Sequence, residues 1–235
     1  MTETTFKPTR EIEPAILSGS KVWLNHERDL PTDASTFSEF KTGFDLKQMT
    51  NEKRVRELFH GRFVSKKLIE RLTGKDPGWL PIGEKGKPVL PQNILASFSH
   101  SGPWIAVWAG TRPEHTKAIG IDLQTWIPER EAALLDEGFR RRSFVFPKML
   151  LALSKKERIT IVFSILEAIQ KILGNANEPF IAISKLELQV DPSLRTWSAQ
   201  SCPNLSISGI YETTEDFALA YGSALPHTQP HLNLN

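Results

Sequence analysis

Hydrophobic residues recur at helical spacing in two long segments of the chain. The first runs from Asn51 to Leu72, where apolar positions repeat every three or four residues and Gly74 is placed to end the helix. The second opens at Ser154, which forms a capping box with Glu157, and its apolar stripe continues to Leu173. The chain therefore has two predicted long helices, which begin about a hundred residues apart.

Strand patterns follow each predicted helix. Residues 94–98 and 104–109 flank a Gly102-Pro103 turn and predict a hairpin, and residues 180–190, 205–211 and 217–221 indicate an antiparallel meander. A helix followed by strands thus occurs twice, which predicts an α+β fold of two similar halves with a cleft between them. We place the halves at residues 1–115 and 116–225, and we expect residues 226–235 to form a loose tail.

One short stretch, AIGIDLQTW from Ala118 to Trp126, places a carboxylate on an otherwise apolar strand. Side chains alternate along a strand, so Ile119, Ile121 and Leu123 face one way while Gly120, Asp122 and Gln124 face the other. An isolated Asp at this place is most often a turn cap. The alternative is that Asp122 belongs to a functional site.

Cations gather in three parts of the N-terminal half. The first helix carries Arg54, Arg62 and Lys66 on one face, Lys85 stands between two glycines in a Pro- and Gly-rich loop, and His100 follows Ser99 at the polar end of the hairpin. Each has an ordinary explanation as a solvated surface or a turn. Together they indicate a site for an anion such as phosphate.

Oxygen donors form a second group, made of Asp122, Gln124 and Glu167. Oxygen ligands in so small a number suit Mg²⁺, which keeps several waters and bridges to substrate phosphates. Glu167 shares a helix stripe with Ser164 and Lys171, and this spacing also fits an ordinary surface Glu–Lys pair. If Glu167 lies near the metal, it is a candidate general base.

A third group, residues 128–149, interleaves basic and aromatic side chains between Phe139 and Lys148. One interpretation is a partly buried loop with a charged rim. The other is a surface that holds an acidic protein by charge and apolar contact.

Composition narrows the class of protein. The 235 residues are 40% hydrophobic, so the chain can bury a substantial core, yet its longest apolar runs are far too short to cross a bilayer. A single cysteine excludes an internal disulfide and a cysteine-rich zinc site. The balance of 29 basic and 27 acidic residues argues against a nucleic-acid coating protein. With no signal-peptide pattern at the N-terminus, we expect a cytoplasmic protein.

An ordered series of motifs resembles one family, the 4'-phosphopantetheinyl transferases of the enterobactin- and surfactin-synthase type. The segments are HGRFVSKKLIERL (60–72), IGEKGKPVLP (82–91), SFSHS (97–101), GIDLQ (120–124), similar to the family's G-I-D-x-E, and FSILEAIQK (163–171), similar to W/F-S-x-K-E-x-x-x-K. The resemblance implies a pseudo-dimer of two α+β halves, a monomer in solution, with coenzyme A and magnesium in the cleft.

The resemblance also implies roles for residues. Asp122, Gln124 and Glu167 would hold Mg²⁺, with Glu167 also the proposed base and Lys171 steadying the pyrophosphate. Residues that would bind coenzyme A are Arg54, Arg62, Lys66, Lys85, Ser99 and His100. The reaction would move phosphopantetheine to a serine of an acidic carrier protein, seated on the Phe139–Lys148 region, in nonribosomal peptide, polyketide or siderophore synthesis.

Two positions depart from the family pattern. Gln124 stands where a second metal carboxylate is usual, and Leu166 stands where a lysine usually precedes the catalytic glutamate. We expect the first to raise the magnesium requirement and the second to slow the reaction. Two alternatives therefore stay open, namely a degenerate homologue that binds coenzyme A or a carrier protein without catalysis, and a magnesium-dependent phosphohydrolase.

Overall fold

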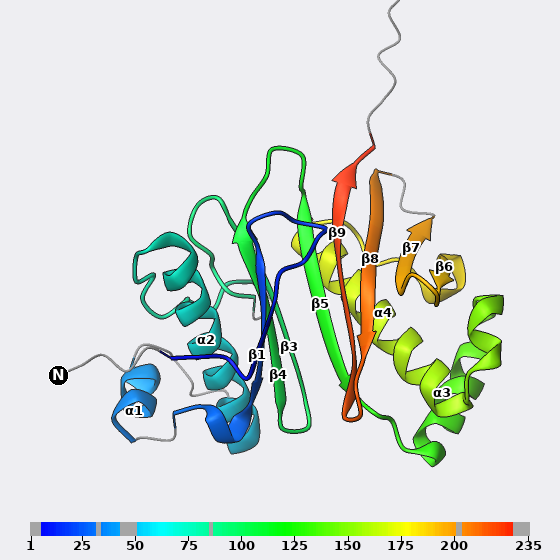
Figure 1. Ribbon diagram of the computed structural model, residues 1–235, viewed down its shortest axis with the longest axis horizontal. Helices are drawn as coiled ribbons and strands as arrows, with labels where there is room; N and C mark the ends of the chain where they lie inside the picture. Colours follow the sequence, from blue (N-terminus) through cyan, green and yellow to red (C-terminus); the bar gives the residue numbers. More distant parts are fainter. Residues whose placement is uncertain (1–5, 32–33, 43–50, 85–86, 201–203, 228–235) are drawn as a thin grey trace, which may run out of the picture.

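The structure is a computed structural model that describes residues 6–31, 34–42, 51–84, 87–200 and 204–227. Two antiparallel sheets form its centre, with helices packed on each (Figure 1). The first sheet has the order β1-β2-β4-β3 and the second has the order β5-β9-β8-β7-β6. The predicted α+β fold is confirmed.

The first sheet comes from the N-terminal part of the chain. Its strands are β1 (Arg10–Ile12), β2 (Lys21–His26), β3 (Ile94–Ser101) and β4 (Trp104–Thr111), and its helices are α1 (Ala34–Thr42) and α2 (Glu52–Thr73). The side chain of Asn51 accepts a hydrogen bond from the backbone of Arg54 at the start of α2 (3.3 Å), and Gly74 ends the helix with a left-handed φ of 68°.

The second sheet comes from the C-terminal part. Its strands are β5 (Ala118–Thr125), β6 (Glu187–Asp191), β7 (Thr196–Gln200), β8 (Leu205–Thr213) and β9 (Phe217–Pro226), and its helices are α3 (Glu129–Arg141) and α4 (Lys155–Asn175). The capping box of Ser154 and Glu157 begins α4 as predicted. The helix ends at Asn175, and Asn177, two residues later, adopts the left-handed conformation.

Three hydrophobic clusters hold the layers together. One lies between α2 and the first sheet, one lies between α3, α4 and the second sheet, and one joins the two sheets. The joining cluster contains Ile119, Ile121 and Leu123 of β5, which confirms the predicted apolar face of that strand. The sheets divide between Thr111 and Ala118, and we propose this division as the boundary between two halves.

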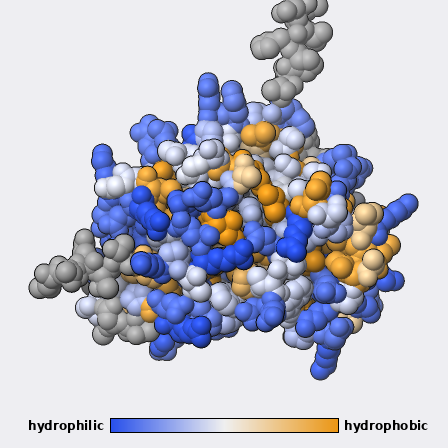
Figure 2. Space-filling view, in the orientation of Figure 1, coloured by the Kyte–Doolittle hydropathy of each residue, from blue (hydrophilic) through white to orange (hydrophobic). Residues whose placement is uncertain are grey.

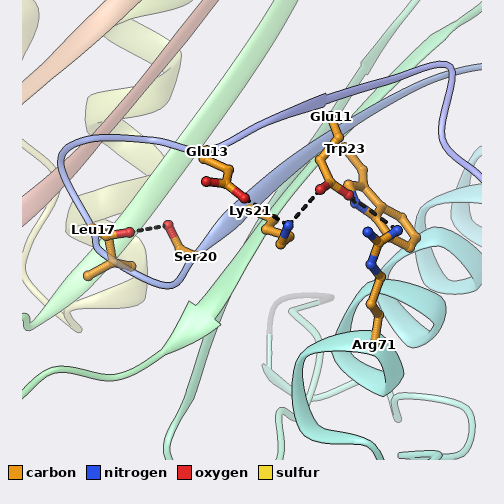
Figure 3. Close-up of polar contacts among 7 residues, drawn as sticks. All are labelled: Glu11, Glu13, Leu17, Ser20, Lys21, Trp23 and Arg71. Atoms are coloured by element: carbon orange, nitrogen blue, oxygen red, sulfur yellow. Dashed lines mark hydrogen bonds and ion pairs between the residues drawn. The ribbon is translucent and has the colours of Figure 1, made fainter.

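A polar cluster fastens the N-terminal strand to the first half (Figure 3). The carboxylate of Glu11 on β1 accepts hydrogen bonds from the Lys21 amine and the Trp23 indole of β2, each at 2.6 Å. Arg71 of α2 lies 3.4 Å from the same carboxylate. The short edge strand is thereby tied to both its neighbour and the helix.

The sequence interpretation was wrong in two segments. Residues 129–141 form α3, where a loop was one interpretation of the basic and aromatic pattern. The last part of the chain has four strands rather than three, because β7 (Thr196–Gln200) lies between the first two predicted strands. The first of these strands also begins later than predicted, at Glu187, after a 3-10 turn (η4, Ile183–Lys185). None of the helices in the described ranges combines the length and apolar character needed to cross a membrane.

Candidate functional site

Gly120 lets α4 approach the central strand β5 closely. A Cβ atom at this position would lie 2.4 Å from the carbonyl oxygen of Ala168 and 2.7 Å from the Ile172 side chain. Only glycine fits that contact without displacing the helix. The face of β5 that carries Asp122 is therefore held directly against α4.

Asp122 is buried and anchored through one of its two carboxylate oxygens. Oδ1 accepts hydrogen bonds from the Ser99 hydroxyl of β3 and the Lys171 amine of α4, both at 2.7 Å. The Ser164 hydroxyl donates to the Asp122 backbone carbonyl (2.9 Å). Within the described ranges, Oδ2 is buried with no hydrogen-bond partner. An unsatisfied buried carboxylate oxygen is costly and indicates a missing partner such as a cation.

Glu167 lies one helical turn before Lys171 and is half-buried. Burial, together with the negative charge of Asp122, raises the pKa of Glu167, and the nearby Lys171 ammonium partly opposes this shift. Lys171 forms its ion pair with Asp122 on β5 rather than the simple surface pair that the Glu–Lys spacing allowed. Two carboxylates and one ammonium thus share a partly buried site.

The oxygen donors fit a weakly held magnesium ion. Asp122 offers the buried Oδ2, and Glu167 offers a second carboxylate. Gln124 is half-buried, and its amide nitrogen donates to the Thr125 carbonyl (3.2 Å). No cluster of three or more His, Cys, Asp or Glu side chains suited to a metal occurs in the described ranges, so the ion would rely on water for most of its ligands.

His100 lies at the end of β3, beside this acidic pair. Its Nε2 is 2.9 Å from Oε2 of Glu57 on α2. Burial lowers the pKa of His100, with smaller contributions from the Lys171 and Arg54 charges, whereas Glu57 and Asp122 oppose the shift. Glu57 was not predicted as a site residue, since an acid on a charged helix gives no local signal.

The predicted cations of α2 occupy different environments. Arg54 is exposed, whereas Lys66 is half-buried, lies 3.1 Å from Asp76 and sits 5.3 Å from the Trp79 ring centre. Arg62 is fully buried against the Phe98 ring (5.5 Å), and burial lowers its pKa to about 10. The explanation of this helix face as a solvated surface is therefore wrong for Arg62.

The Pro- and Gly-rich loop crosses to the second half of the molecule. Lys85 lies outside the described residues, but the amine of Lys87 donates to the Gly174 carbonyl in the last turn of α4. A cation is favoured there by the helix dipole. Lys87 was not among the predicted site residues, although its place beside Gly86 suits an anion.

A comparison with known protein families matches one segment of the chain. Residues 45–109 match the model of the 4'-phosphopantetheinyl transferase N-terminal domain. This part of the chain is therefore similar to the N-terminal domain of that family. No protein of known, curated function matched the chain in a search of such proteins.

The family match spans only part of the site. It includes α2, the Lys87 loop and the β3–β4 hairpin, and hence Lys66, Ser99 and His100. Asp122, Glu167 and Lys171 lie beyond it, on the strand and helix of the second half. The basic side chains predicted to bind phosphate thus lie inside the matched segment, and the acidic groups lie outside it.

The Phe139–Lys148 region differs from its predicted form. Phe139 and Phe144 are buried and pack with Phe146, so these aromatic rings support the surface rather than form it. The large apolar side chains exposed in this region and close to it in sequence are Leu134, Val145, Met149 and Leu151. Figure 2 shows hydrophobic surface at the right-hand edge of the molecule, over the α3 and β6 region of Figure 1.

Proposed function

We propose that the protein transfers 4'-phosphopantetheine from coenzyme A to a serine hydroxyl of an apo carrier protein and releases adenosine 3',5'-bisphosphate. The observation that carries the proposal is the buried carboxylate of Asp122, with one oxygen anchored and the other without a described partner, beside Glu167. The carrier would serve nonribosomal peptide, polyketide or siderophore synthesis, as the motifs suggest.

The charged residues near Asp122 suit a ligand that carries a diphosphate. Lys66 and Arg54, with Lys85 from outside the described residues, would bind the phosphates of coenzyme A by charge, and His100 would donate a hydrogen bond to them. Arg62 is assigned instead to the support of Phe98, since it is fully buried there. Lys171 would stabilise the charge that develops on the departing bisphosphate.

Magnesium, when bound by Asp122, Glu167 and Gln124, would supply the positive charge that neutralises the diphosphate. Glu167 would take the proton from the hydroxyl of the carrier serine. The serine oxygen would attack the β-phosphorus of coenzyme A, and the bond between that phosphorus and the bridging oxygen would break, which releases the bisphosphate. The raised pKa of Glu167 brings it closer to the working pH, which favours this role.

The carrier would dock on the exposed apolar residues Val145, Met149 and Leu151, which have a basic rim. Arg140 and Arg141 are exposed on α3, and Lys148 adjoins the patch. An acidic carrier helix would meet this rim by charge and the patch by apolar contact.

A second candidate is a homologue that binds coenzyme A or a carrier without catalysis. The Lys171 ammonium favours this second candidate, because it lies 2.7 Å from Asp122 and already compensates the negative charge of that carboxylate. Gln124 supplies no further negative charge for a metal ion. A magnesium-dependent phosphohydrolase is disfavoured, since two-metal sites of that class usually carry more carboxylates.

One assay separates the candidates. The protein is incubated with coenzyme A, Mg²⁺ and an apo carrier protein, and the carrier is then weighed by mass spectrometry beside a carrier whose acceptor serine is alanine. A gain of the phosphopantetheine mass on the serine carrier alone supports the proposal. Coenzyme A binding without a gain supports the second candidate and contradicts the first.

A further inference from the structure

The edge of β5 that faces the first half is closed by side chains instead of a neighbouring strand. β3 and β5 belong to different sheets, yet three serines at alternate positions of β3 contact β5. The Ser97 hydroxyl accepts from the Ile121 backbone (3.1 Å), the Ser99 hydroxyl donates to Asp122 (2.7 Å), and the Ser101 hydroxyl accepts from the Thr125 backbone (3.0 Å). We call Ser97, Ser99 and Ser101 the serine ladder.

The helix α4 closes the same edge from its other side. The Lys171 amine donates to the Ile121 carbonyl (3.0 Å), and the Asn175 amide donates to the Ile119 carbonyl (2.9 Å). Buried backbone groups at a strand edge require such partners. The serine ladder therefore fixes the register between the two halves, and Ser99 alone of its members contacts a functional side chain.

The two carboxylate oxygens of Asp122 have different contacts, and Ser99 contributes to this difference. Ser99 and Lys171 both donate to Oδ1, so the carboxylate is held from two directions at one oxygen. Without the serine hydroxyl, Lys171 would be the remaining side-chain donor among the described contacts, and the carboxylate could turn to share both oxygens with it. Oδ2 would then be compensated by Lys171 and less available to another cation.

We propose that Ser99 is a positioning residue, whose hydroxyl fixes Oδ1 of Asp122 and thereby keeps Oδ2 available to a divalent cation. The inference rests on the proposed function only in taking Asp122 as a cation ligand. It assigns Ser99 to the acid rather than to coenzyme A, which was the role expected from the sequence. Ser97 and Ser101 also bind the β5 backbone, but they do not contact the carboxylate.

The test measures Mn²⁺ affinity by electron paramagnetic resonance in the whole protein, without coenzyme A or carrier. Mn²⁺ prefers the same oxygen ligands as Mg²⁺ and is directly observed. Ser99→Ala is compared with Ser99→Thr, which keeps a hydroxyl, and with Ser97→Ala and Ser101→Ala, which each remove a different rung of the ladder. The urea unfolding midpoint of every variant is measured, so that a loss of folding is separated from a loss of binding.

We expect Ser99→Ala to weaken Mn²⁺ binding about three- to tenfold, and Ser99→Thr to restore most of it. Ser97→Ala and Ser101→Ala should lower the unfolding midpoint while leaving Mn²⁺ affinity within about twofold.

Equal weakening in all three alanine variants, or no weakening in Ser99→Ala, overturns the proposal. So does a wild-type protein that binds Mn²⁺ no better than Asp122→Asn. Failure of carrier modification in a protein that shows the expected Mn²⁺ pattern contradicts the proposed function alone.

Discussion

At the scale of single residues, Glu57 brings a negative charge into the cation cluster expected to bind phosphate. Its carboxylate lies 2.9 Å from His100 Nε2 and competes with any phosphate for that donor. We predict that Glu57→Gln strengthens coenzyme A binding about fivefold, or roughly 1 kcal/mol, because the repulsion and the competition are both removed. Isothermal titration calorimetry measures the dissociation constant.

The matched control for this prediction is Glu70→Gln. Glu70 also lies on α2 and pairs with a basic side chain, Lys67, at 2.8 Å, in place of a residue of the site. That variant should bind coenzyme A as the wild type does. Equal affinities of Glu57→Gln and wild type would show that His100 is not part of the phosphate site.

Glu167 should make the stability of the protein depend on pH. Because burial and Asp122 raise the pKa of Glu167, its contribution to stability is greatest in acid and is lost as the pH rises through that pKa. Glu167→Gln removes the buried charge, so its stability relative to wild type should increase between about pH 4 and pH 7. Urea unfolding at several pH values tests this, and a difference that stays constant across the range would contradict it.

At the scale of elements, the contact of α4 with β5 depends on Gly120. A methyl group there would meet the Ala168 carbonyl at 2.4 Å, which is backbone and cannot turn aside. We predict that Gly120→Ala lowers the free energy of unfolding by about 3 kcal/mol. Gly138 on α3 is the control, since its Cβ would meet nothing within 4 Å, and Gly138→Ala should be about 0.5–1 kcal/mol more stable. Similar urea midpoints for the two variants would refute the close packing.

Leu166 is a second test of how α4 packs. The sequence comparison suggested that a lysine at this position would aid catalysis, but Leu166 is only 4% exposed and belongs to the core beneath the second sheet. Leu166→Lys should therefore lower the free energy of unfolding by about 3 kcal/mol. Leu134→Lys, at a position 64% exposed, should change it by less than about 0.5 kcal/mol. Retained stability in Leu166→Lys would show that its side chain can reach the cleft.

Local sequence patterns predicted the helices and strands better than they predicted the contacts between them. Periodicity and caps predicted α2 and α4, and alternation predicted both faces of β5. Residues 129–141 were harder, because the apolar positions on the buried side of α3 are few and arginines crowd its end. Arg62 shares a helix stripe with Lys66, and only the packing of β3 against α2 decides that it is buried.

At the scale of the whole molecule, the recurrence of helix and strands predicted two packed parts, and the two sheets agree with it. The contact of Ser99 with Asp122 could not be predicted, since it joins residues 23 positions apart across two sheets. The partner of Lys171 was equally hidden, because its nearest acid along the helix is Glu167 rather than Asp122. The sequence thus indicated which residues belong to the site, but the contacts between them depend on how the two sheets and α4 pack.

The central claim is that Asp122 and the groups around it support transfer of phosphopantetheine to a carrier serine. The most direct measurement is the initial rate at which an apo carrier gains the phosphopantetheine mass, with wild-type protein and with Asp122→Asn, at saturating coenzyme A and Mg²⁺. We predict that the wild type modifies the carrier and that Asp122→Asn is slower by at least about 100-fold. A wild type that binds coenzyme A but leaves the carrier unmodified, or an Asp122→Asn variant of undiminished rate, would contradict the claim.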